Sequence, residues 1–185
     1  GFAWGQLKRD NYVGYFPIDA ICNIMVNNSH KIKALRTYGF AGPKVQEKVL
    51  ATLSIGAEIN PNGEKQNGYV NCGEFGWIYE NHICPIDEYH KDPIEIAKLF
   101  LNAPYLWGGK QSLGLDCSGL AQISNWVCGK NLPRDAYVQE TCGVGVEIKP
   151  DLTGLKRGDL VFWQAPVAMM MDESNIIHAN AFHMC

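Results

Sequence analysis

The chain has 185 residues, of which 46% are hydrophobic and 19% are charged, and its formal net charge is −3. A chain of this length and composition can bury a core and hold one domain together with a smaller one. The slightly negative charge gives no general attraction to nucleic acid or to an anionic membrane surface, so we expect neither partner. There is no run of about eighteen apolar residues, and we expect no membrane span.

The seven cysteines are an odd number and show no Cys-x-x-Cys spacing. His82 lies near Cys84, but this pair is not a metal-ligand array, so we expect no zinc and no other cofactor. Reduced thiols fit a cytoplasmic chain. The first residues, Gly1 to Trp4, lack the basic and then apolar pattern of a signal peptide, and we expect none in this chain.

The first 88 residues have the pattern of a β-rich segment. Short apolar runs alternate with turn residues, at 12–16, 33–38, 51–53, 57–59, 69–72 and 75–79. Among the separating segments, Asn60-Pro61-Asn62-Gly63 has the composition of a hairpin turn. The pattern predicts a small all-β barrel.

A short internal repeat supports this prediction. Residues 11–21 align with residues 73–83 at an offset of 62 (76 minus 14), and both copies carry glycine, an aromatic residue and then an apolar residue. The repeat predicts that residues 1–27 are the end of one β module and that residues 28–88 are a complete second module.

Residues 89–185 change from helical patterns to strand-like ones. A helix is expected over 92–102, because an Asp-Pro pair at its start suits the N-cap and first helical positions. A second helix is predicted over 117–128, and a short third one over 135–139.

Three β-like runs follow, at 159–163, 167–171 and 175–179, and a hairpin-sized loop joins the last two. Helices first and antiparallel strands after them predict an α+β fold.

Cys117 is the strongest candidate for a reactive residue. It lies where a glycine-flanked loop meets the start of the second helix, within Asp116-Cys117-Ser118-Gly119-Leu120. Unpaired backbone N–H groups and the positive end of the helix dipole stabilise a thiolate at such a position. A cysteine followed about sixty residues later by a histidine in a β-like run, His178, is the papain-type order of nucleophile and histidine.

At these residues the chain resembles the NlpC-type cell-wall peptidases, bacterial members of the papain-like superfamily. The matching segments follow the family's order and are residues 103–109, 115–120, 132–135, 155–163 and 176–181. The resemblance implies a papain-like catalytic domain over residues 89–185, with the nucleophile helix packed on an antiparallel sheet. It also implies further strands after residue 181, so this domain is expected to be C-terminally truncated. The β modules resemble the bacterial Src-homology-3-like modules that often precede such domains.

The resemblance also assigns roles to residues. Cys117 would attack an amide carbonyl to form a thioester, and the Tyr105 hydroxyl would help to bind the oxyanion. Asp116 and Ser118 would line the pocket for the free amino end of a stem peptide. Two alternatives stay open: Tyr105 packs under the glycine loop, and Asp116 caps the helix. Arg134 and Asp135 are expected to serve as an ion pair and a helix cap.

One position departs from the family. Pro166 stands where the family has its general-base histidine, because His178, twelve positions later (178 minus 166), matches the third, orienting residue. A proline cannot accept a proton. Either His178 or the auxiliary candidate His183 takes over the role, or hydrolysis is impaired, or the site has turned to binding.

Three functions remain open. The first is a peptidase that hydrolyses the γ-D-glutamyl to diamino-acid bond of peptidoglycan stem peptides or their fragments. The second is a degenerate hydrolase that binds cell-wall fragments, and the third is another thiol reaction such as acyl transfer. The family fits either the bacterial cytoplasm or the cell envelope. The sequence leaves open the preferred diamino acid and the oligomeric state.

Overall fold

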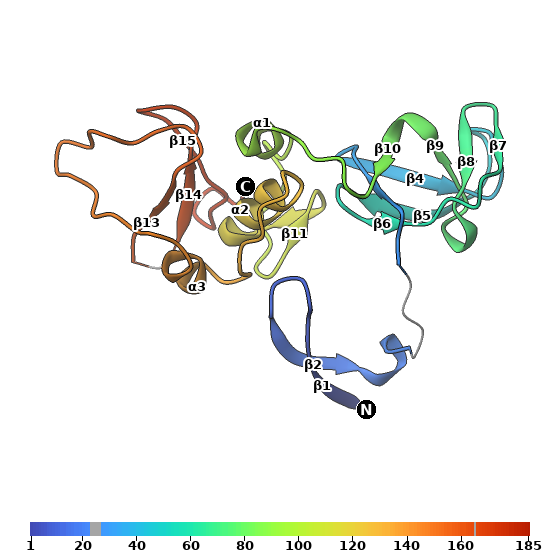
Figure 1. Cartoon of the computed structure of the whole chain (residues 1–185), viewed down its shortest axis with the longest axis horizontal. Coiled ribbons are helices and arrows are strands. Elements are labelled where there is room, and N and C mark those ends of the chain that lie inside the picture. Colours follow the sequence, from blue (N-terminus) through green and yellow to red (C-terminus); the bar gives the residue numbers. More distant parts are fainter. Residues whose placement is uncertain (23–26, 165) are drawn as a thin grey trace. The chain divides into compact units, whose positions relative to one another are not determined.

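The computed structural model describes residues 1–22, 27–164 and 166–185 (Figure 1). The chain divides into two compact units. One consists of Val26–Tyr89, and the other combines Gly1–Met25 with His90–Cys185. In the part of the chain that the structure describes, no helix has the length and apolar character needed to cross a membrane.

The unit of Val26–Tyr89 is built of strands and short 3-10 turns, as its sequence pattern predicted. A five-stranded sheet has the order β5-β4-β9-β8-β7, and a three-stranded sheet has the order β10-β3-β6. The elements are β3 (His30–Ile32), β4 (Arg36–Phe40), β5 (Val49–Ser54), β6 (Glu58–Ile59), β7 (Lys65–Gln66), β8 (Tyr69–Asn71), η2 (Gly73–Phe75), β9 (Trp77–Tyr79), η3 (Glu80–His82) and β10 (Ile83–Pro85). That this unit is a Src-homology-3-like barrel stays a prediction.

Both sheets of this unit contribute to one core. Its buried members are Ile32, Ile59, Val70, Cys72, Ile78 and Ile83. In β4 and β9, buried residues alternate with more exposed ones, so that one face of each strand turns inward.

Two details of the predicted β pattern are wrong. Residues 60–63 do not close a hairpin, because β6 pairs with β3 and β7 pairs with β8. The hairpin turn lies at Asn67 and Gly68, which both have positive φ, 51° and 78°, as a type I′ turn requires. Burial explains the pairing, since Ile59 is fully buried beside β3 whereas β7 is exposed. The run predicted at 33–38 is also interrupted, and β4 begins only at Arg36.

The internal repeat is visible in the backbone. In the N-terminal hairpin, β1 (Phe2–Gln6) pairs with β2 (Val13–Pro17), and η1 (Ile18–Ala20) follows. The 3-10 turn η3 follows the β8–β9 pair in the same way, at the offset of 62 (80 minus 18). Each turn ends with the N–H of an isoleucine, Ile21 or Ile83, bonded to the first carbonyl of the turn. That the hairpin ends a separate module stays a prediction.

The helices of the other unit are α1 (Pro93–Lys98), α2 (Cys117–Trp126) and α3 (Ala136–Thr141). The predicted N-cap of α1 is confirmed, because the Asp92 side chain accepts the N–H of Ile94 at 2.8 Å. The helix is shorter than predicted, since its last turns tighten to 3-10 bonds and Asn102 has a φ of 65°. Asp135 stands at the N-cap of α3, but its side chain makes no capping bond there, contrary to the prediction.

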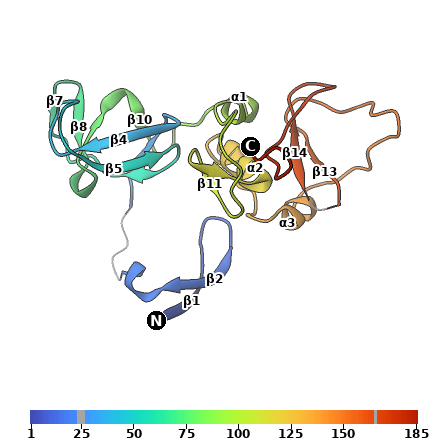
Figure 2. The same ribbon diagram turned by 180° about the vertical axis from the view of Figure 1, so that it is seen from behind.

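Three antiparallel strands, β13 (Leu160–Phe162), β14 (Val167–Met170) and β15 (Ile176–Ile177), form the sheet of this unit in the order β13-β14-β15. Helix α2 packs against the central strand β14, whose four residues are all buried. Both views show the long connection from α3 to β13 extending away from this sheet (Figure 2). The α+β arrangement predicted for this half is confirmed.

Candidate active site

Cys117 is the first residue of α2 and follows directly from a small hairpin. Strand β11 (Lys110–Gln111) pairs with β12 (Gly114–Leu115), and Asp116 then begins the helix as its N-cap. The loop before β11 is tied to the same place, since Leu106 N donates to the Leu115 carbonyl at 3.0 Å. The nucleophile candidate is therefore held between a hydrogen-bonded hairpin and the first turn of a helix.

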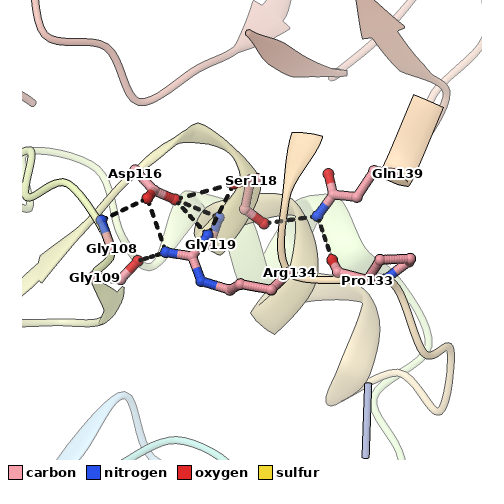
Figure 3. Close-up of polar contacts among 8 residues, drawn as sticks. All are labelled: Gly108, Gly109, Asp116, Ser118, Gly119, Pro133, Arg134 and Gln139. Atoms are coloured by element: carbon pink, nitrogen blue, oxygen red, sulfur yellow. Dashed lines mark hydrogen bonds and ion pairs between the residues drawn. The ribbon is translucent and has the colours of Figure 1, made fainter. Parts of the chain in front are cut away.

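Asp116 is the centre of a buried polar network (Figure 3). Its Oδ1 accepts from Gly119 N at 2.8 Å, Ser118 Oγ at 3.2 Å and Arg134 Nη1 at 3.0 Å. Its Oδ2 accepts from Gly108 N and Arg134 Nη2, both at 2.8 Å. The helix-capping alternative is thus what the structure shows, and the expected ion pair of Arg134 is present.

Asp116 and Arg134 each stabilise the charged form of the other. Burial alone would raise the pKa of Asp116, but hydrogen bonds from Arg134, Gly119 and Gly108 outweigh it and lower that pKa below its ordinary value. Burial of the Arg134 guanidinium is likewise outweighed by Asp116, and the pKa of Arg134 is raised. Both groups are therefore charged throughout the neutral range.

A cavity of about 630 Å³ opens on one side of Cys117. It is lined by the predicted residues Tyr105, Asp116 and Ser118 together with Arg134. Tyr105 and Cys117 both line this cavity, and burial raises the pKa of the Tyr105 phenol. The cavity size suits a small peptide.

Sequence reasoning did not identify the residues of the N-terminal hairpin that line this cavity. Leu7, Asp10 and Tyr12 line it, although they are more than a hundred residues from α2. Gln122 Nε2 of α2 donates to Asp10 Oδ2 at 2.9 Å. The Arg9 guanidinium lies 3.9 Å from the centre of the Trp126 ring. The sequence contains no local signal for contacts at such a separation.

A second cavity, of about 510 Å³, lies on the histidine side of Cys117. Cys117, Tyr105, Pro166, His178 and His183 all line it. The cavity therefore brings the start of α2 together with Pro166, which precedes β14, and with His178, which follows β15. Among the residues that the structure describes, Cys117 and His178 are not hydrogen-bonded to each other.

His178 and His183 differ in their surroundings. Burial lowers the pKa of His178, whose ring centre lies 5.1 Å from that of Trp163. His183 is exposed, and its backbone N–H and its Nδ1 lie 2.8 and 3.2 Å from the Asn180 side-chain oxygen. His178 is thus a neutral, partly buried imidazole at neutral pH, which is the form that accepts a proton.

Pro166 lines both cavities beside Cys117. It lies just before β14, and its carbonyl accepts the N–H of Trp163 at 3.3 Å. In the described residues, no group of three or more histidine, cysteine, aspartate or glutamate side chains is arranged to hold a metal ion.

Comparisons with known proteins agree with this arrangement. Residues 102–184 match the model of the NlpC/P60 family. A γ-D-glutamyl-L-lysine dipeptidyl-peptidase of Bacillus cereus is 32% identical over 84% of this chain and 46% of its own length. Dipeptidyl-peptidase 6 of Lysinibacillus sphaericus is 26% identical over 88% of this chain and 65% of its own length. The chain thus spans about half to two thirds of these relatives.

A solved structure shares the fold. The crystal structure of an NlpC/P60 family protein from Bacillus cereus superposes with a TM-score of 0.70 and 22% identity, covering 91% of this chain and 62% of that one. The fold likeness extends well beyond the residues that the family model matches. Residues 102–184, which carry Cys117 and His178, are the part of the chain that matches the NlpC/P60 family.

Proposed function

We propose that this protein is a cysteine peptidase that hydrolyses the bond between γ-D-glutamate and a diamino acid in peptidoglycan stem peptides. One observation carries the proposal: the Cys117 side chain, at the start of α2, lines both the cavity of Asp116 and Ser118 and the cavity of His178. A peptide could thus lie on both sides of the thiol. The names of the relatives, which act on γ-D-glutamyl-L-lysine, suggest the substrate.

The reaction would proceed in two steps. The Cys117 sulfur attacks the γ-carbonyl carbon, its proton passes to a base, and the diamino acid leaves as an amine that takes up this proton. Water then attacks the thioester, releases the dipeptide and restores the thiol. The Cys117 backbone N–H and the Tyr105 hydroxyl would donate to the oxyanion.

We infer that His178 is the base in this chain, with His183 as an auxiliary candidate. Both line the cavity on the histidine side of Cys117, and burial lowers the pKa of His178, which favours the neutral ring. Asp116 already accepts five hydrogen bonds. Its expected contact with the amino end of the peptide would therefore act together with Ser118 and not alone.

The test is hydrolysis of L-Ala-γ-D-Glu-L-Lys, measured as the release of free lysine. We expect the full chain to release lysine, and Cys117→Ser to abolish the release while it retains the same far-ultraviolet spectrum. Cys142→Ser is the matched control, since Cys142 is exposed and lies outside both cavities. Loss of activity in the control alone, or full activity in Cys117→Ser, would exclude Cys117 as the nucleophile.

Thiol labelling gives an independent check. Burial raises the pKa of Cys72 to about 11 and raises the pKa values of Cys84 and Cys128. These three thiols should therefore react slowly with iodoacetamide, and Cys117 should react first among the seven. Mass mapping that finds another cysteine labelled before Cys117 would count against the assignment.

A second candidate function follows from Pro166, which stands beside Cys117 where the resemblance implies a base. A site without an effective base would bind a stem peptide and release it unchanged. Calorimetry with the tripeptide, run beside the hydrolysis assay, separates the two functions. Binding without release of lysine would favour the binding module.

The β-rich residues are proposed to assist this function. We propose that residues 28–88 form a Src-homology-3-like module, that residues 1–27 are the end of another, and that residues 89–185 are the catalytic domain. The repeated 3-10 turns η1 and η3 support the first two assignments.

A further inference from the structure

The cavity on the Asp116 side of Cys117 contains two cationic side chains, and they differ in what they already bind. The two terminal nitrogens of Arg134 already donate hydrogen bonds to Asp116, Ser118 and the Gly109 carbonyl. Lys110 also lines this cavity. In the ranges 1–22, 27–164 and 166–185, its ammonium forms neither a hydrogen bond nor an ion pair.

Lys110 is held close to the nucleophile by the backbone. In the β11–β12 hairpin it is directly opposite Leu115, two residues before Cys117. Residues opposite each other in an antiparallel pair have Cα atoms only about 4.5–5.5 Å apart. The hairpin therefore places the Lys110 backbone next to the residues that lead into α2, and Lys110 and Cys117 line the same cavity.

The surroundings of Lys110 favour the arrival of an anion. Lys110 is an exposed residue, but partial burial of its ammonium lowers its pKa; Asp10 opposes this, and the charges of Arg9 and Arg134 lower the pKa further. A partly desolvated ammonium among other cations is stabilised when a carboxylate binds to it. Asp10 and Asp135, which line the same cavity, would in turn attract the positively charged end of a ligand.

A γ-linked glutamyl peptide has this distribution of charge. Its scissile bond uses the side-chain carboxyl of glutamate, so the α-carboxylate of the same residue stays free and ionised at neutral pH. Together with a free amino end it makes the peptide a zwitterion. The α-carboxamide analogue, D-isoglutamine, has the same shape and lacks the negative charge.

We propose that the Lys110 ammonium binds the free α-carboxylate of the γ-linked glutamyl residue and makes the site select D-glutamate over D-isoglutamine. The inference rests on the proposed function for the position of the peptide in the cavity. It assigns Lys110 to substrate selection and leaves the Asp116–Arg134 pair as the support of the helix start.

The experiment compares two tripeptides, L-Ala-γ-D-Glu-L-Lys and its α-carboxamide, on the full chain. A hydrogen bond between charged groups predicts a kcat/KM about ten- to a hundredfold higher for the acid. Lys110→Met should remove this preference by lowering kcat/KM for the acid alone, and Lys110→Arg should retain most of it. Lys149→Met is the matched control, because Lys149 is exposed and lines neither cavity.

Two kinetic results would overturn the inference. One is a wild-type chain that hydrolyses both tripeptides equally well. The other is a Lys110→Met variant that loses the same factor on both, because Lys110 would then act through the structure of the hairpin and not through the carboxylate.

Binding to the Cys117→Ser variant separates this inference from the proposed hydrolysis. Calorimetry with L-Ala-γ-D-Glu and with L-Ala-D-isoglutamine should show tighter binding of the acid, and Lys110→Met in the same background should abolish the difference. If neither tripeptide is hydrolysed but this Lys110-dependent difference persists, the peptidase proposal fails and the selection by Lys110 stands. Equal binding of both dipeptides would overturn the selection, whatever the outcome for hydrolysis.

Discussion

The Asp116 carboxylate and the Arg134 guanidinium are joined by two hydrogen bonds side by side, Nη1 to Oδ1 at 3.0 Å and Nη2 to Oδ2 at 2.8 Å. Both residues are less than a tenth exposed. This planar, two-point contact fixes the direction of the carboxylate as well as its charge. Because the same carboxylate accepts from Gly108 and Gly119, the pair ties the glycine loop to the first turn of α2.

Arg134→Ala should therefore destabilise the unit that contains α2. Removing Arg134 leaves the buried Asp116 charge without its cation, and breaking a buried ion pair in this way typically costs about 3–5 kcal/mol. The carboxylate is then supported by the bonds from Gly108, Ser118 and Gly119. Denaturant unfolding followed by tryptophan fluorescence measures this, since four of the five tryptophans, Trp4, Trp107, Trp126 and Trp163, belong to this unit. Arg134→Lys should fall between the wild type and Arg134→Ala, because an ammonium cannot form both bonds at once.

The pH dependence of stability gives the control. The folded pKa of Asp116 is lowered, so its contribution to stability is present above its unfolded pKa of about 3.9 and is lost as the pH falls through the lower folded value. Arg134→Ala should weaken this acid dependence. A variant within about 1 kcal/mol of the wild type at pH 7 would show that the pair contributes little.

Gly119→Ala should also be destabilising, although alanine is the better helix former by about 1 kcal/mol. A Cβ at this position would overlap the Gly109 carbonyl oxygen. That carbonyl cannot move freely, because it accepts hydrogen bonds from Asp116 N and Arg134 Nη2, both at 3.2 Å. Overpacking of this kind costs about 1–3 kcal/mol, and the same unfolding measurement should show a net loss.

Gly143→Ala is the control for this substitution. No atom lies within 4 Å of a Cβ added to Gly143. It should be neutral, or more stable by up to about 1 kcal/mol, because alanine restricts the unfolded chain. Equal effects of both substitutions would contradict the packing argument.

The sequence predicted those parts of the fold and site that depend on local patterns. The N-cap of α1 at Asp92 and the start of α2 at Cys117 are local signals that the structure confirms. The turn at 60–63 was wrong because the burial of Ile59 against β3 decides the strand pairing, and this contact depends on residues far apart in the chain.

The same limit applies to the site. Cys117 and the residues that bind Asp116 could be predicted, because they lie close together in the sequence or in motifs that follow one another in a fixed order. Asp10 and Tyr12 reach the cavity only through the contacts of the N-terminal hairpin with α2. Lys110 could have been found from its place in the glycine-flanked loop, but only the three-dimensional structure shows that its ammonium has no hydrogen bond or ion pair among the described residues.

His178 should titrate below its ordinary pKa of about 6.5, because burial disfavours the charged imidazolium. The neutral ring then contributes stability that is complete above the unfolded pKa and is lost as the pH falls through the lower folded value. Histidine ring resonances followed by NMR between pH 4 and pH 8 measure this pKa, and His178→Gln assigns the signal. A His178 resonance that titrates at or above 6.5 would refute the prediction.

Pro166→His should retain the fold and raise hydrolysis of L-Ala-γ-D-Glu-L-Lys by at least about tenfold. His178 makes no hydrogen bond to Cys117 among the described residues, so it is expected to be a weak base, whereas a positioned general base contributes about a hundred- to ten-thousandfold. Position 166 lines both cavities beside Cys117. It precedes β14, and its backbone carbonyl, which accepts the N–H of Trp163, is retained in any substitution. Pro166→Ala is the control, because it removes the ring without adding a base and should leave the rate near that of the wild type. The contrary outcome has three parts: the unmodified chain is already fast, Pro166→His leaves the rate unchanged, and His178→Ala abolishes the reaction. His178 alone would then be a sufficient base, and the proline at position 166 would not limit the rate.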